Sequence, residues 1–235
     1  MPPRVAGGVE TSTTTEIDFF FDPVCPFAWM TSRWVDQVAG QRPLDVQWRF
    51  IALRMVNAER DYDTEFPPGY DGFHTAGLRL LRVAAAVRHT AGNDAVGALY
   101  TAMGAALWDQ PPEPGSLLRS DAGTREQAAA ALADAGLDTS LAEAVDDESF
   151  DELIGAETQV ALRRAGRDVG TPILTFGPPD GPSFFGPVIS RLPSDADALR
   201  LWEAVVTLAH FDSFSELKRS RRELPALAAL GNLTA

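Results

Sequence analysis

The chain has few of the residues that build covalent or metal cross-links. It contains one cysteine, Cys25, and three histidines among 235 residues. A single cysteine excludes an internal disulfide framework and a zinc site made of several thiolates. The histidines, His74, His89 and His210, show no ligand spacing with one another or with acidic residues, so we expect no bound metal. Each histidine is interpreted as a surface or capping residue.

Several motifs and long apolar runs are also missing. The sequence has no G-x-G-x-x-G loop, no P-loop and no G-x-S-x-G elbow, which removes the usual grounds for nucleotide or serine-hydrolase chemistry. No apolar run approaches the roughly 20 residues of a membrane-spanning helix. The start, MPPRVAGGVETSTTTE, lacks the apolar core of a secretory signal. We therefore expect a cytoplasmic protein with no membrane partner.

Basic residues are outnumbered by acidic ones. The 20 Lys and Arg residues against 33 Asp and Glu residues give a net charge of −13, which repels phosphate backbones and anionic lipids. Nucleic acid is therefore not an expected partner. Lys218 is the only lysine while arginine is abundant, a composition that suggests a GC-rich, actinobacterial genome. A hydrophobic content of 45% and a charged content of 23% indicate a globular protein with a core.

The order of hydrophobic patterns predicts an α/β protein interrupted by helices. Alternating apolar residues predict strands near residues 17–21 and 46–52, and the helical pattern between them makes the two strands parallel. A further strand is predicted at residues 173–176, immediately after Thr171-Pro172, and a short one in PSFFGPVIS. Ser194 is predicted to begin a final helix. The expected parts are a flexible tail (1–15), an N-terminal α/β part (16–72), a helical insertion (73–165), a C-terminal α/β part (166–222) and a tail (223–235).

Cys25 stands where the first strand is expected to change into a helix, in the segment DPVCPFAW. Pro26 suits the first position of a helix. Free backbone N–H groups and the helix dipole stabilise a thiolate at such a position, so we expect the pKa of the Cys25 thiol to fall from about 8.5 into the range of roughly 3.5–7.5. The alternative is that Cys25 is a small buried apolar residue. The surrounding pattern favours the reactive thiol.

The chain resembles the DsbA-like branch of the thioredoxin superfamily and, within it, the mycothiol-dependent nitroreductase family of actinobacteria. The resemblance is carried, in order, by FDPVCPFAW, TSRW (31–34), NAER (57–60), YTAMG (100–104), DVGTP (168–172), FFGPV (184–188) and ELKR (216–219). It implies a thioredoxin fold with a large α-helical insertion between the second strand and the cis-proline strand. It also implies that Cys25 is the nucleophile, that Pro172 is a cis proline facing it, and that a low-molecular-weight thiol such as mycothiol is the co-substrate.

The sequence departs from the family pattern at the site itself. The family pattern is Cys-Pro-Trp-Cys, whereas this chain has Phe27 for the tryptophan and Ala28 for the second cysteine. An intramolecular disulfide therefore cannot form. The family also tends to carry a histidine several residues after YTAMG, where this chain has Trp108. A dithiol cycle and any role of that histidine are absent here.

Six residues are candidates for binding the substrate. Asn57 follows the second predicted strand and Tyr70 lies in a Pro-Gly loop; their alternative interpretations are a turn residue and a half-buried anchor. The full set of candidates is Pro26, Phe27, Asn57, Tyr70, Trp108 and Thr171.

The sequence thus predicts monothiol redox chemistry through a mixed disulfide at Cys25. The expected partners are a small-molecule thiol and an electrophilic or disulfide substrate, and homodimerisation is left open. Two alternatives remain. One is a redox-silent enzyme like the kappa-class transferases and hydroxychromene-carboxylate isomerases, in which the thiol cofactor is the nucleophile. The other is a thioredoxin-fold binding module without catalysis.

Overall fold

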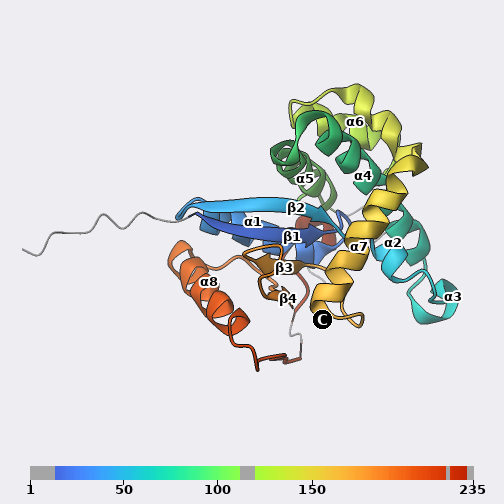
Figure 1. Cartoon of the computed structure of the whole chain (residues 1–235). Helices are drawn as coiled ribbons and strands as arrows, with labels where there is room; N and C mark the ends of the chain where they lie inside the picture. The colour runs from blue at the N-terminus through green and yellow to red at the C-terminus, as the bar shows by residue number, and fades with distance from the viewer. Residues whose placement is uncertain (1–13, 112–119, 221–222, 232–235) are drawn as a thin grey trace, which may run out of the picture.

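The computed structural model describes residues 14–111, 120–220 and 223–231. A mixed sheet lies at the centre, and a group of helices extends beyond one of its edges (Figure 1). The described strands are β1 (Thr15–Phe21), β2 (Leu44–Phe50), β3 (Ile173–Phe176) and β4 (Ser183–Phe185). Their order is β2-β1-β3-β4. β1 is parallel to β2, as the sequence predicts, and antiparallel to β3; β4 is antiparallel to β3.

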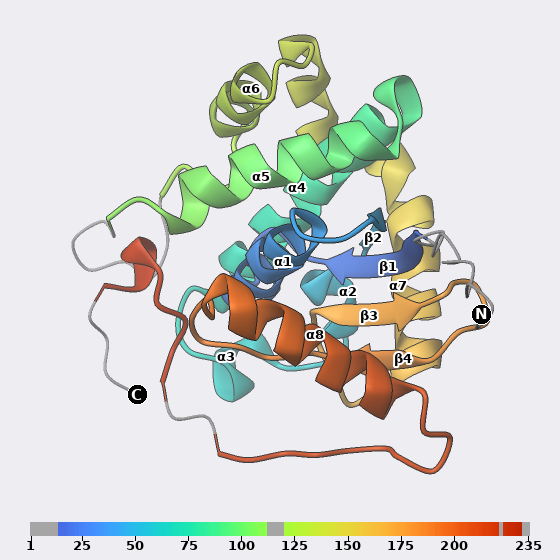
Figure 2. The ribbon, with the colours of Figure 1, turned by 90° about the vertical axis from the view of Figure 1, so that its left-hand side faces the viewer.

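The central strand β1 separates two apolar layers. Phe19 and Phe21 belong to the main core and Phe20 to a smaller core on the other face; all three rings are fully buried. This alternation follows from the two-residue period of a strand. The main core lies under α1 (Pro26–Ala39) and α8 (Asp195–Ala209). The smaller core lies under α7 (Asp151–Ala165), which Figure 2 shows behind the sheet.

Two tryptophans join α1 to α8. The rings of Trp34 and Trp202 have centroids 5.6 Å apart, and the indole Nε1 of Trp34 donates to the carbonyl oxygen of Ala198 at 3.2 Å. The predicted helix start at Ser194 is confirmed, since its side chain accepts a hydrogen bond from the Asp197 backbone N–H. These contacts fix the orientation of α1, the helix that begins next to Cys25.

The helices between β2 and β3 form the expected insertion. They are α2 (Leu53–Val56), α3 (Tyr62–Glu65), α4 (Tyr70–Ala91), α5 (Asn93–Trp108), α6 (Arg125–Asp134), the 3-10 segments η1 (Thr139–Asp146) and η2 (Glu148–Phe150), and α7. Gly92 separates α4 from α5 with a φ of 87°, a value that favours glycine. The helical part of the chain begins earlier than the predicted residue 73, since α2 begins at Leu53 and α4 at Tyr70.

The predicted tails differ from the structure where it describes them. β1 begins at Thr15, so this residue belongs to the sheet, while residues 1–13 lie outside the described residues. Near the other end, the 3-10 helix η3 (Ala228–Leu230) follows Leu227, and Leu227 and Ala229 are buried in the main core. The prediction of a tail over residues 223–235 is therefore wrong for residues 227–230, because Leu227 and Ala229 are packed in the core.

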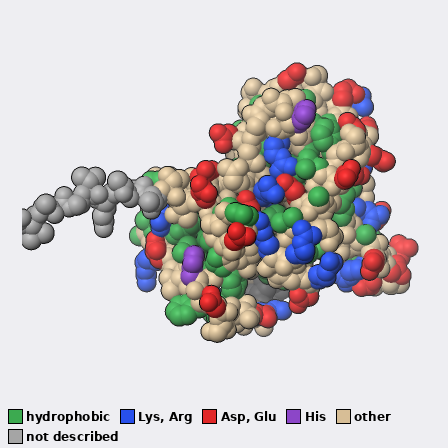
Figure 3. Space-filling view, viewed as in Figure 1, with side chains coloured by type: hydrophobic (Ala, Val, Ile, Leu, Met, Phe, Trp, Pro, Cys, Tyr) green, Lys and Arg blue, Asp and Glu red, His purple; other side chains and the backbone are tan. Residues whose placement is uncertain are grey.

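Basic and acidic side chains are interspersed on the face shown in Figure 3. Within the described residues, no helix is both long and apolar enough to cross a membrane.

The open edge of β2 is occupied by polar side chains from two helices. Asn93 on α5 accepts a hydrogen bond from the backbone N–H of Trp48 at 2.8 Å and donates to its carbonyl at 2.9 Å. Glu157 on α7 accepts from the Phe50 N–H at 2.9 Å. The same carboxylate pairs with Arg88 at 3.1 Å and with Arg49 at 3.2 Å. Glu157 therefore joins α7, α4 and the sheet through a buried network.

Removing the Glu157 carboxylate should destabilise the fold. Glu157→Ala leaves two guanidinium groups and one backbone N–H without their acceptor, so we expect the free energy of unfolding to fall by about 3 kcal/mol. Urea denaturation would measure the loss. Glu143→Ala is the matched control, because Glu143 pairs with Arg125 at an exposed site, where the expected loss is below about 1 kcal/mol. Equal losses in both variants would contradict the structural role of Glu157.

Candidate active site

Cys25 is the N-cap residue of α1, at the turn that follows β1. Its backbone is extended, with φ −91° and ψ 111°, and its sulfur accepts a hydrogen bond from the Ala28 N–H at 3.4 Å. The Cys25 N–H donates to the Asp22 carbonyl at 3.0 Å. This is the strand-to-helix position that the sequence predicts. Pro26 occupies the first turn of the helix, as expected.

The loop before β3 brings a second segment against the thiol. The peptide bond between Thr171 and Pro172 is cis, and the Cys25 Sγ donates to the Thr171 carbonyl at 3.3 Å. The Thr171 hydroxyl donates to the Phe20 carbonyl at 2.8 Å, which ties the loop to β1. The Gly186 N–H in turn donates to the Pro172 carbonyl at 2.8 Å. The prediction of a cis proline in the segment that faces Cys25 is confirmed.

The electrostatic environment of Cys25 differs from the expectation. The residue is only 6% exposed, and burial raises the pKa of its thiol to about 12. The backbone N–H of Ala28 favours the thiolate, but it does not offset desolvation, and the nearby Asp22 opposes a second negative charge. The expected lowering of the pKa is therefore wrong for this closed arrangement. The thiol is held as a neutral donor.

Asp22 is a buried acid at the site that the sequence interpretation missed. Its carboxylate accepts hydrogen bonds from the Val24 N–H at 3.0 Å and from the Leu53 N–H at 2.7 Å. Burial raises its pKa to about 7, although both hydrogen bonds favour the charged form. A side chain at Gly77 on α4 would lie 2.4 Å from this carboxylate. An acidic residue directly after an apolar strand was the signal for it.

Tyr100 is the second group that the sequence interpretation did not single out, although it begins the YTAMG segment. Its ring is 1% exposed and stacks on Phe21 with centroids 4.0 Å apart. Burial raises the pKa of its hydroxyl well above the usual value, and the nearby Cys25 adds to this effect. Tyr100 therefore belongs to the apolar surroundings that keep Cys25 neutral.

Trp108 lies behind the active-site turn. Its indole Nε1 donates to the Pro23 carbonyl at 3.0 Å, and only 1% of the residue is exposed. Trp108 thus supports the turn that carries Cys25. Because its ring is buried, a substrate cannot contact it in this arrangement. Phe27, in the first turn of α1, is half-buried.

Asn57 and Tyr70 are half-buried on the helices beside the turn. Asn57 ends α2, and its side-chain amide donates back to the Leu53 carbonyl at 2.8 Å. Tyr70 begins α4 and packs near His74, with ring centroids 5.7 Å apart. Within the described residues, the Cys25 sulfur is hydrogen-bonded to Thr171 and Ala28, and neither Asn57 nor Tyr70 contacts it in this way. Their proposed contacts with a substrate stay predictions.

The interpretation of His74 as a surface or capping residue is wrong. It is 4% exposed, and its Nδ1 forms a 2.8 Å hydrogen bond with the Tyr62 hydroxyl. Burial and the positive charge of Arg54 lower its pKa to about 4. His74 is therefore a buried, neutral residue of α4 that packs against Tyr62 of α3. In the described part of the chain, no three His, Cys, Asp or Glu side chains form a group that could hold a metal ion.

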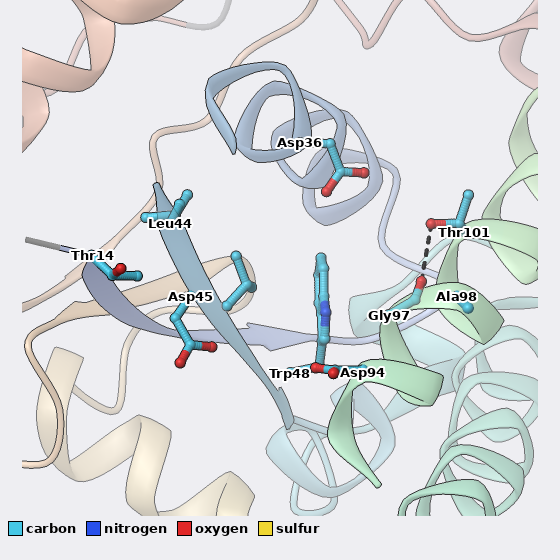
Figure 4. Close-up of a pocket in the computed structure, with 10 residues that line it drawn as sticks. Thr14, Asp36, Leu44, Asp45, Trp48, Asp94, Gly97, Ala98 and Thr101 are labelled. Carbon is cyan, nitrogen blue, oxygen red and sulfur yellow. Dashed lines mark hydrogen bonds between the residues drawn. The ribbon is translucent and has the colours of Figure 1, made fainter. Parts of the chain in front are cut away.

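A hollow of about 500 Å³ lies at the opposite end of the sheet from Cys25. Figure 4 shows Asp36 on α1, Asp45 and Trp48 on β2, and Thr101 on α5 around it. Leu44 at the start of β2 pairs with the start of β1, whereas Cys25 follows the end of β1. This hollow is therefore separate from the thiol.

The reactivity of Cys25 should report its burial. Because the thiolate is the nucleophile and the pKa is raised to about 12, alkylation by iodoacetamide should accelerate about tenfold per pH unit between about pH 7 and 9. Intact-mass kinetics would measure this, with Cys25→Ser as the unreactive control. A plateau below about pH 8 would instead indicate a thiolate stabilised in the resting protein.

Comparisons with known proteins agree with this geometry. The model of the Rv2466c-like family, described as mycothiol-dependent nitroreductase Rv2466c, matches residues 24–219. The uncharacterized protein Rv2286c of Mycobacterium tuberculosis is 30% identical over 213 residues, which cover 88% of this chain and 83% of that protein.

Two solved structures share the fold at low identity. The probable DsbA oxidoreductase SCO1869 from Streptomyces coelicolor is 14% identical, with a TM-score of 0.50 and coverage of 89% of this chain and 95% of the other. The cytosolic disulfide reductase DsbM from Pseudomonas aeruginosa, solved with GSH, is 16% identical, with a TM-score of 0.51 and coverage of 82% and 100%. The fold is thus the DsbA-like thioredoxin fold. Since the family match spans most of the sequence and includes the Cys25 turn and the Thr171-Pro172 loop, the chain belongs to the Rv2466c-like family.

Proposed function

We propose that the protein is a cytoplasmic thiol-disulfide oxidoreductase of the monothiol type, with a low-molecular-weight thiol such as mycothiol as co-substrate. The observation that carries the proposal is the position of Cys25, whose sulfur lies between the Ala28 N–H and the Thr171 carbonyl before cis-Pro172. The mycothiol dependence named for the matching family supports the choice of thiol.

The reaction needs one cysteine and two exchange steps. The Cys25 sulfur attacks a disulfide R–S–S–R′ as a thiolate, forming Cys25–S–S–R and releasing R′–S⁻, which takes up the proton that Cys25 lost. A second thiol, R″–SH, then attacks the mixed disulfide. This attack releases the disulfide R–S–S–R″, and the Cys25 thiolate takes up the proton from R″–SH. Electrons and protons balance without a second cysteine in the chain.

The closed site gives the local residues specific tasks in this cycle. The Ala28 N–H is placed to stabilise the Cys25 thiolate when it forms. The Thr171 carbonyl, which accepts from the resting thiol, is free once the thiol proton has left and can then accept a hydrogen bond from a bound substrate. Entry of substrate must also open the apolar surroundings of Cys25. The substrate-bound state is therefore the one in which the thiol reacts.

Exposure to oxidised mycothiol tests the proposal directly. We expect intact mass to increase by one mycothiol per chain, and dithiothreitol should remove the adduct because it is a disulfide. Cys25→Ser should gain no mass. Absence of a reducible adduct on the wild-type chain would support the two alternatives, a redox-silent enzyme or a binding module.

Ala28→Cys should create a reducible disulfide with Cys25. Position 28 is fully buried and its backbone N–H already contacts the Cys25 sulfur at 3.4 Å, so the two side chains lie close enough for a bond. Mild oxidation followed by alkylation should leave no free thiol in this variant.

Ala39→Cys is the matched control for that variant. Position 39 ends α1, about 20 Å along the helix axis from Cys25, so two thiols should stay available for alkylation. Two free thiols in oxidised Ala28→Cys would show that the start of α1 does not support the bond.

A further inference from the structure

The hollow between α1, β2 and α5 lies at the end of the sheet away from Cys25 (Figure 4). Its volume of about 500 Å³ falls within the range of roughly 300–1,000 Å³ that is typical of small-molecule sites. Arg33 on α1 donates to the Thr101 hydroxyl on α5 at 3.2 Å, and Asn93 joins the start of α5 to the backbone of Trp48 on β2. The three elements around the hollow are therefore connected to one another directly.

Trp48 lines the hollow with a hydrogen-bond donor that has no partner. The residue is only 6% exposed, and its ring packs against Phe19, Phe21 and Tyr100 with centroids 5.2, 5.9 and 5.5 Å apart. The hydrogen bonds that Trp48 makes to other described residues all use its backbone, so the indole Nε1 has no acceptor among them. Buried indole N–H groups usually have a partner. A ligand that brings an acceptor into the hollow would supply one.

Gly97 on α5 allows the indole edge to lie at the wall of the hollow. A Cβ atom at this position would lie 2.4 Å from Trp48 Nε1, and Gly97 itself lines the hollow. Figure 4 shows Gly97 and the Trp48 ring on the same side of the hollow, with the Thr101 hydroxyl bound to the Gly97 carbonyl at 3.0 Å. Unlike the Tyr100 hydroxyl, Trp48 Nε1 is not a fully enclosed unpaired atom. This donor is therefore open to the hollow.

Carboxylates make the rim of the hollow negative. Asp36 forms an ion pair with Arg33 at 2.9 Å, whereas Asp45 and Asp94 pair with no lysine or arginine among the described residues. The basic side chains outside the described part of the chain are Arg4, Arg119, Arg221 and Arg222. Because binding experiments use the full chain, they include the effect of these four groups. A cation is the favoured ligand at such a rim, and an anion is repelled.

We propose that this hollow binds a small primary amine that carries a carbonyl oxygen beside its ammonium group and an apolar side chain, as in an amino-acid amide. The ammonium group pairs with Asp94, and the carbonyl oxygen accepts a hydrogen bond from Trp48 Nε1. The apolar side chain packs on Leu44 and Val46, which are half-buried at the hollow. A free carboxylate on the ligand would face Asp94, so the amide binds better than the amino acid. This site goes beyond the thiol chemistry, since Cys25 takes no part in it.

Titration of the full chain with leucinamide tests the proposal, with ¹H–¹⁵N correlation spectra of the indole N–H groups as the measurement. The chain has five tryptophans, and the spectrum of Trp48→Phe identifies the Trp48 resonance. We expect this resonance to shift and saturate with a dissociation constant of about 1 mM or lower. Cys25→Ser should give the same shift. The absence of a saturable shift at Trp48 in the wild-type chain would overturn the proposal, and would leave thiol exchange at Cys25 unaffected.

Three analogues separate the contacts of the ligand. N-acetyl-leucinamide lacks the positive charge, isoamylamine lacks the carbonyl group, and leucine adds a carboxylate. We expect each to bind about tenfold more weakly than leucinamide. An affinity equal to that of leucinamide for any of the three would contradict the contact that this analogue removes or opposes, and with it the assigned ligand class.

Asp94→Asn tests the carboxylate while keeping the shape of the side chain. Asp94 is exposed in the first turn of α5, so the variant should fold, and we expect leucinamide to bind about fivefold more weakly. Asp134→Asn is the matched control, because Asp134 is exposed at the end of α6 and does not line the hollow. This control changes the net charge by the same amount and should keep the wild-type affinity. Equal affinities of the two variants would overturn the role of Asp94.

Discussion

The hydrogen bond between the Cys25 sulfur and the Thr171 carbonyl joins two segments that are 146 residues apart in the chain. It forms only when β1 and β3 pair side by side and the whole helical insertion returns the chain to the sheet. The Thr171 hydroxyl strengthens this arrangement by binding to β1 at Phe20. The site therefore depends on the complete fold, and neither half of the chain contains it.

Burial and helix position act in opposite directions on the nucleophile. The N-terminus of α1 favours a thiolate, but Cys25 is buried in the main core, to which Phe21, Trp29 and Tyr100 also belong, and the nearby Asp22 adds a negative charge. Desolvation is the larger effect, as the raised pKa of the buried Asp22 also shows. In the resting state, Cys25 is therefore protonated, and a thiol reacts with electrophiles more slowly than a thiolate does.

Local patterns in the sequence were enough to predict β3, the parallel pairing of β1 with β2, the helix starts at Pro26 and Ser194, and the position of Cys25 at a strand-to-helix turn. Each follows from side-chain periodicity or from a cap residue. The pKa of Cys25, the buried state of His74 and the packing of Leu227 could not be predicted in this way, because each depends on which distant helices cover the residue. Asp22 was missed because its hydrogen bonds to Val24 and Leu53 become visible only when α2 is placed beside the turn.

The side chains of Asn93 and Glu157 form hydrogen bonds with the backbone groups of Trp48 and Phe50 on β2, an outer strand of the sheet. A strand from another molecule could add there only by displacing both side chains and leaving Arg88 and Arg49 without their carboxylate. The opposite outer strand, β4, is three residues long. Exposed strand edges are the usual starting points of intermolecular sheet growth. The two side chains therefore disfavour sheet growth at the Trp48–Phe50 end of β2, because an added strand would first have to break their hydrogen bonds.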